Sequence, residues 1–158
     1  MTRGLALLPL TAVLLAGCGG GGGGAAGGGL SKADYVGRAG AICKDAAAKR
    51  DATALPTDLT GLSPYVSTLV GIVRDASTRL SALEPPKADA AQLRAKFTEP
   101  LAAQVKVGED YAARVQAAGK DSAKLQQLLA QRPGKGAIDT QFLTAYGLDS
   151  CVKAASGG

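Results

Sequence analysis

The 158-residue sequence has no histidine and no tryptophan, and aromatic residues make up only 4% of it. Without histidine, a serine nucleophile lacks its usual base, and a metal site lacks its commonest nitrogen ligand. With few aromatics and much of the apolar content in alanine, we expect a thin core of closely spaced helices and modest burial per residue. Neither an enzyme nor a cofactor or metal site is therefore indicated.

The sequence also lacks a block of charge of one sign, although its formal net charge is +5. Lysines and arginines alternate with acidic residues, and no basic stripe is interleaved with aromatics, so nucleic-acid binding is not indicated. A mild attraction to anionic lipid headgroups fits this charge. Opposite charges stand four residues apart at positions typical of exposed helix faces, namely Asp45/Lys49, Asp75/Arg79 and Asp110/Arg114.

No apolar run is long enough to cross a membrane as a helix, which needs roughly 20 residues. The mostly apolar stretch from Leu5 to Ala16 follows the positive charge of Arg3, an order typical of a secretory signal. It ends in the sequence LAGC at Cys18, which resembles the lipobox of bacterial lipoproteins. In that family the cysteine receives a diacylglycerol, the preceding peptide is removed, and the cysteine becomes the acylated N-terminus.

This resemblance implies a lipoprotein signal peptide over residues 1–17 and a lipidation site at Cys18, with palmitate-type chains. The protein would then be lipid-anchored in the cell membrane, on the extracytoplasmic face. The alternative is an ordinary cleaved signal with a chance cysteine. Residues 19–29 read GGGGGGAAGGG, a tract whose flexible chain reaches about 18 Å. We therefore expect a lipidated cysteine and Gly-rich linker over residues 18–29, followed by one domain over residues 30–158.

Two cysteines remain after lipidation, Cys43 and Cys151. In a compartment outside the plasma membrane they are expected to form a disulfide that joins the start of the folded region to its end. The alternative is a pair of free buried thiols, since reduced cysteine packs as a small hydrophobic residue. A metal pair is less favoured because no histidine is present to complete it.

The apolar spacing predicts helices and no strand. The first helix starts at a capping box from Ser31 to Asp34 and carries Cys43 beside its apolar face. The dipeptide Ser63-Pro64 predicts the N-cap and first residue of a second helix, which Pro85 and Pro86 end. Its apolar positions recur every three or four residues, at Val66, Leu69, Val73, Ala76, Leu80 and Leu83.

A third segment is predicted over residues 88–118, with a kink or break at Pro100 and its end at Gly119. Two shorter helices are predicted over residues 121–132 and 139–146. The expected fold is all-α, a small antiparallel bundle of four to five helices. A C-terminal segment would return to the first helix through Cys151.

Three segments carry a second resemblance: LSKADYVGRAGAICKDA near the start, LSALEPP in the middle and AYGLDSC near the end. They resemble a group of small secreted or lipid-anchored helical proteins from actinobacteria. The likeness supports the helical fold and the cysteine pair, and it brings no catalytic residues with it. Adjacent acids such as Glu109 and Asp110 point about 100° apart on a helix, so we interpret them as a solvated face.

Two function classes remain. The first is a lipid-anchored accessory or interaction module that meets an envelope protein partner. The second is a binding protein for a small apolar or amphipathic ligand held between the helices, where Gly37, Gly40, Gly71 and Gly108 would leave room. A ligand site needs an apolar cavity of roughly 300 Å³ or more, whereas an interaction module needs an exposed apolar patch.

Overall fold

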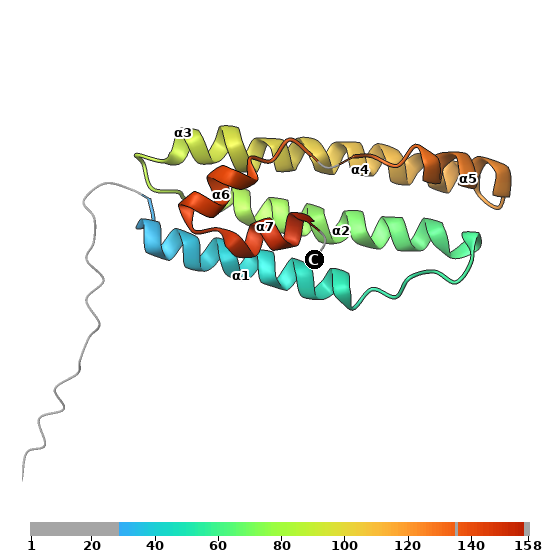
Figure 1. Cartoon of the computed structure of the whole chain (residues 1–158), viewed down its shortest axis with the longest axis horizontal. Helices are drawn as coiled ribbons and strands as arrows, with labels where there is room; N and C mark the ends of the chain where they lie inside the picture. Colours follow the sequence, from blue (N-terminus) through green and yellow to red (C-terminus); the bar gives the residue numbers. More distant parts are fainter. Residues whose placement is uncertain (1–28, 135, 157–158) are drawn as a thin grey trace, which may run out of the picture.

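The computed structural model describes residues 29–134 and 136–156, and every regular element within them is helical (Figure 1). The all-α prediction is thus confirmed, whereas Cys18 and residues 1–28 lie outside the described residues. The elements in chain order are α1 (Lys32–Asp51), the 3₁₀ turn η1 (Leu59–Gly61), α2 (Leu62–Ser81), α3 (Ala90–Leu93), the π turn η2 (Arg94–Thr98), α4 (Glu99–Ala118), α5 (Ser122–Ala130), α6 (Thr140–Tyr146) and α7 (Asp149–Ser156).

The elements build an elongated bundle (Figure 1). Helix α2 packs between α1 and α4, and the residues of α3, η2 and α4 follow one another without interruption as one long helix. Helix α5 folds back onto the far end of α4, and α6 and α7 return so that α7 packs along α1. None of the helices in the described part is both long and apolar enough to span a bilayer.

The first helix begins where the sequence predicted. The backbone N–H of Asp34 donates to the Ser31 hydroxyl oxygen at 3.1 Å, and that hydroxyl donates to the Asp34 carboxylate at 2.6 Å. This N-cap satisfies a backbone donor that has no partner within the first turn. The apolar face that follows is buried through Tyr35, Ala39 and Ile42, and Cys43 is buried beside it.

The predicted start of the second helix is wrong by two residues, since Gly61 and not Ser63 is the N-cap. Helix α2 begins at Leu62, and Pro64 lies inside its first turn. Proline fits there because the first-turn N–H groups have no intrahelical partner to lose. The carboxylate that organises this region is Asp58, which accepts from the N–H groups of Thr60 and Gly61 at 2.8 and 3.1 Å and so caps η1.

Buried side chains form two separate clusters. The larger joins α1, α2, α3, η2, α4, α6 and α7, and its members include Tyr35, Leu80, Phe97, Leu143 and Leu148. The smaller joins α2, α4 and α5 at the far end: Leu62, Val66, Tyr111, Val115, Ala118 and Leu125. The thin core expected from the composition is therefore divided along the length of the bundle.

The predicted charge pairs are confirmed in part. Lys49 lies 3.1 Å from Asp45, and Arg79 lies 3.4 Å from Asp75, each four residues apart. Two of these groups also link α1 to α2, because the Arg79 guanidinium donates to the Asp45 carboxylate at 2.6 Å. The Arg79 guanidinium, followed by Lys49, lowers the pKa of the Asp45 carboxyl.

Candidate functional site

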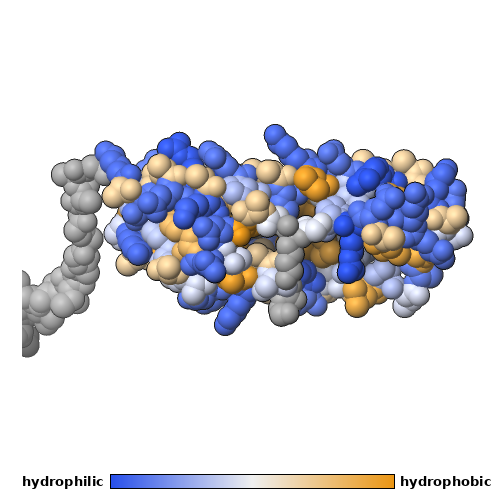
Figure 2. All heavy atoms as spheres, turned by 45° about the horizontal axis from the view of Figure 1, so that its top comes forward, coloured by the Kyte–Doolittle hydropathy of each residue, from blue (hydrophilic) through white to orange (hydrophobic). Residues whose placement is uncertain are grey.

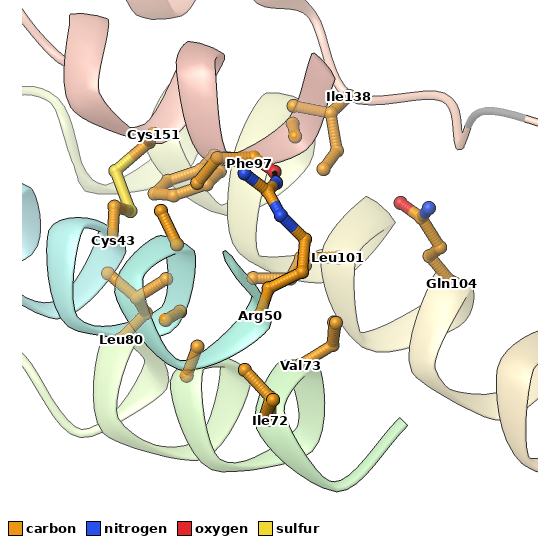
Figure 3. A pocket seen from close by; sticks show the side chains of 15 residues that line it. Cys43, Arg50, Ile72, Val73, Leu80, Phe97, Leu101, Gln104, Ile138 and Cys151 are labelled. Carbon is orange, nitrogen blue, oxygen red and sulfur yellow. Dashed lines mark hydrogen bonds between the residues drawn. A yellow bond between two sulfur atoms is a disulfide. The ribbon is translucent and has the colours of Figure 1, made fainter. Parts of the chain in front are cut away.

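An apolar cavity of about 160 Å³ lies where α1, α2, α4 and α7 meet (Figure 3). Its walls are small or aliphatic side chains together with one aromatic ring and the cystine, which leaves few polar atoms inside. The lining residues are Cys43, Ala46, Ala47, Arg50, Ile72, Val73, Ala76, Leu80, Phe97, Leu101, Gln104, Ile138, Cys151, Ala154 and Ala155.

The predicted disulfide between Cys43 and Cys151 is present and forms part of the cavity wall. It joins α1 to α7 across a sequence separation of 108 residues, with the two Cα atoms 4.9 Å apart. The alternative of two free thiols is therefore wrong. The bond fixes α7, and with it the wall of the cavity that this helix supplies.

Polar groups stand only at the rim. The Arg50 side chain reaches across the apolar residues, and its guanidinium donates to the carbonyl of Ala154 in α7 at 2.7 Å (Figure 3). It also donates to the Asp51 carboxylate at 2.9 and 3.0 Å. Gln104 of α4 contributes an amide at the opposite edge. Such an arrangement selects an apolar group and orients it through a few polar contacts.

The π turn places Phe97 in the cavity wall, and Pro100 explains the turn. Proline has no N–H, so the carbonyl of Lys96 loses its usual helical donor. The structure replaces that donor with the N–H of Asp139, which lies 3.2 Å from the Lys96 carbonyl oxygen. The Lys96 ammonium lies 3.2 Å from the Asp139 carboxylate. The backbone carbonyl and the side chain of Lys96 therefore both bind Asp139, the residue before α6.

Pro100 thus neither breaks the helix nor ends it. Within η2 the N–H of Glu99 donates to the carbonyl of Arg94, five residues earlier, and α4 then continues through Pro100. Local π turns inside α-helices are frequent at functional sites. Here the turn carries Phe97 to the cavity.

Two further depressions share lining residues with the cavity. Gln104 lines the cavity and both depressions. One depression also has Val73 in common with the cavity, and the other has Ile138 in common with it. Val73 is 37% exposed although it lies on the apolar stripe of α2. Figure 2 shows apolar side chains beside a hollow near the middle of the bundle, on a face where hydrophilic side chains are otherwise widespread. In the depression that includes Val73, the side chains of Leu69, Val70 and Val105 complete an apolar seam beside the cavity.

The glycines expected to leave room between helices do not line this cavity. Nothing lies within 4 Å of a side chain added at Gly37 or Gly71, and at Gly40 the nearest atom is 3.9 Å away. Of the four, only Gly108 lies close to another helix, since a Cβ atom added there would be 3.2 Å from a methyl of Val70. Gly108 lines a neighbouring depression and not the cavity. The open space comes instead from the alanines of α1, α2 and α7.

Tyrosines pack at the edges of the two clusters. Tyr35 and Tyr146 meet edge to face with ring centroids 6.3 Å apart, and the Tyr146 hydroxyl donates to Asp89 at 2.7 Å. In the smaller cluster, the Tyr111 hydroxyl donates to the carbonyl of Leu128 at 3.1 Å. Burial raises the pKa of Tyr35, and burial followed by the Asp89 hydrogen bond raises that of Tyr146.

We predict that this tyrosine pair makes the fold sensitive to alkali. Because the folded pKa values lie above the ordinary value of about 10, their contribution to stability is complete below that pH and is lost as the pH rises through and beyond it. A near-ultraviolet titration of tyrosinate should show late ionisation that Tyr146→Phe reduces, and the variant should lose less stability in alkali. A titration curve unchanged in Tyr146→Phe would contradict this.

The acidic residues of the helix faces are not gathered into a site. Arg74 of α2 donates to Glu109 of α4 at 2.6 Å, an exposed pair that links the two helices. Over residues 29–134 and 136–156, no group of three or more histidine, cysteine or acidic side chains is placed to hold a metal ion. Comparison with known proteins gives no further assignment, because no family model, curated protein or solved structure matches this chain.

Proposed function

We propose that the protein is a lipoprotein held in the cell membrane on the extracytoplasmic face through acyl chains on Cys18. The order of Arg3, the apolar stretch, the LAGC sequence and the glycine tract supports this. The disulfide between Cys43 and Cys151 also supports it, because such bonds persist in oxidising compartments and are rare in the cytosol. Two acyl chains give stable membrane binding, whereas one gives only marginal binding.

Replacing Cys18 by alanine should abolish labelling by radioactive palmitate and leave the uncleaved precursor, since the sulfur that accepts the lipid is absent. Metabolic labelling followed by mass measurement checks both results. The matched control is Gly24→Ala in the linker, which should keep the label. Undiminished labelling of the Cys18→Ala chain would exclude this anchor.

The bundle then acts as an interaction module, taking an apolar side chain of an envelope protein into the cavity. The observation that carries this is the size of the cavity, about 160 Å³. A cavity of about 150 Å³ holds one benzene ring, whereas drug-sized ligands occupy roughly 300 Å³ or more. The space therefore fits a single partner side chain, and the adjoining seam around Val73 offers apolar surface to its neighbours. Buried anchors of this kind dominate the energetics of protein interfaces.

Filling the cavity should remove binding without unfolding the protein. Ala46→Leu adds an apolar group to the cavity wall, whereas Ala48→Leu makes the same change at an exposed position of α1. A photo-crosslinking residue at Val73 in intact cells should capture one protein, and Ala46→Leu, but not Ala48→Leu, should abolish the capture. A crosslinker at exposed Ala113 serves as the background. Equal capture in both alanine variants would contradict the assignment of the cavity.

The second candidate is a small apolar ligand of about the size of a benzene ring. The apolar walls and the two rim groups, Arg50 and Gln104, favour this class. Native mass spectrometry of the protein extracted gently from its own membranes separates the two candidates. A reproducible extra mass beyond the lipid, absent from Ala46→Leu, would identify a ligand-binding protein.

A further inference from the structure

A second pocket, of about 290 Å³, lies at the end of the bundle where the glycine linker joins it. We call it the linker-end pocket; Tyr35, Ser81, Pro85, Lys87, Arg94 and Thr98 are among its lining residues. The backbone N–H of Leu30 donates to the carbonyl of Glu84 at 3.0 Å, and α1 begins beside the turn that joins α2 to α3 (Figure 1).

The entry of the linker is fixed beside this pocket. Gly29 has a φ of +126°, and a Cβ atom there would come within 2.6 Å of the Pro85 carbonyl oxygen. Only glycine fits such a conformation and such a close approach. The sequence of residues 19–29 predicts a reach of about 18 Å, so a lipid on Cys18, as proposed above, would lie near the pocket.

The pocket is positively charged. Lys87 and Arg94 line it, no acidic side chain does, and neither cation forms an ion pair within the described residues. Arg94 and Thr98 are the first and last residues of the π turn η2. The same turn that sends Phe97 into the apolar cavity therefore contributes a cation and a hydroxyl to the linker-end pocket.

Tyr35 supplies a polar group without a partner. Its side chain is only 1% exposed, and its hydroxyl makes no hydrogen bond with the residues that the structure describes. The linker-end pocket is the opening that its side chain lines.

We propose that the linker-end pocket binds the phosphate group of an anionic phospholipid, with Lys87 and Arg94 pairing with its charge and Tyr35 donating to it. This inference rests on the proposed lipid anchor, which holds this end of the bundle at the headgroups. Arginine and lysine both recognise phosphate, arginine by a planar fork and lysine as a point charge. The result is a bundle that is oriented on the membrane as well as attached to it.

Titration of the full lipidated protein, in a neutral detergent, with short-chain phosphatidylglycerol tests the proposal. Binding is followed by the nuclear magnetic resonance signals of the tyrosine rings. The double variant Lys87→Gln/Arg94→Gln should weaken binding about tenfold or more, because each cation near an anionic headgroup contributes measurably. The matched control Lys120→Gln/Arg132→Gln removes two exposed charges at other positions and should bind as the wild type does. Tyr35→Phe should weaken binding without abolishing it.

Two further probes decide what is recognised. Short-chain phosphatidylcholine carries the same phosphate with a compensating cation, and equal binding of that lipid would overturn the proposal. Inorganic phosphate binding as tightly as phosphatidylglycerol would also overturn it, in favour of a free anion. Failure here is distinguishable from failure of the anchor, since palmitate on Cys18 does not depend on Lys87 or Arg94, and the titration does not measure palmitate.

Discussion

Loss of the disulfide should lower the free energy of unfolding by about 4–5 kcal/mol, because the bond closes a loop spanning 108 residues in the unfolded chain. The variant is Cys43→Ala/Cys151→Ala, studied by equilibrium denaturant unfolding. In a small domain with a divided core, this is a large part of a total stability that is typically about 5–15 kcal/mol. The same loss should appear when the wild-type protein is unfolded in the presence of a reducing agent.

The reduced wild type is the stricter comparison, since it keeps both sulfur atoms in the core. If reduction leaves the unfolding midpoint unchanged, the bond does not stabilise the fold and α7 is held by packing alone. If the midpoint falls, loss of the cavity should follow, because Cys151, Ala154 and Ala155 of α7 form one of its walls. Capture of a partner by the crosslinker at Val73 should then decline together with stability.

Phe97→Ala should destabilise the protein by about 3–5 kcal/mol, the range found when a buried aromatic side chain is truncated. Phe97 is 2% exposed and touches both the larger cluster and the cavity. Phe97→Leu keeps most of the buried volume and should lose much less. Equilibrium denaturant unfolding of the two variants gives the comparison.

The truncation also enlarges the cavity, which provides a second readout. Benzene, which binds apolar cavities of about 150 Å³, should raise the unfolding midpoint of Phe97→Ala more than that of the wild type. A variant as stable as Phe97→Leu would mean that neighbouring side chains had collapsed into the space. The assigned wall of the cavity would then need revision.

Local signals were sufficient to predict much of the fold. Ser31 caps its helix as its spacing to Asp34 indicated, and Asp121 and Asp139 cap the two shorter helices that were predicted to begin at about these positions. Gly119 and Gly147 have positive φ and end their helices. Each of these features is decided within about one helical turn, so the sequence carries it without knowledge of the tertiary structure.

Features that depend on distant residues were not predicted. The π turn before Pro100 is stable because Asp139, 39 positions beyond the proline, supplies a donor to Lys96. Helix α7 was expected only as a segment returning to α1, since eight residues give too short a pattern to recognise by themselves. The cavity arises from alanines on three helices, none of which stands out in the sequence.

The position of the disulfide has a mechanical consequence. When the chain is pulled by its ends, the covalent link carries the force, and the residues between Cys43 and Cys151 cannot be stretched. Between Leu30 and Ser156 only the short outer segments can then be extended, to a total length of about 65 Å rather than the roughly 450 Å of an unlinked chain. For a protein attached to a membrane through its N-terminal linker, as proposed, tension on the linker would extend the chain no further than Cys43, because the covalent bond carries the force from there to Cys151.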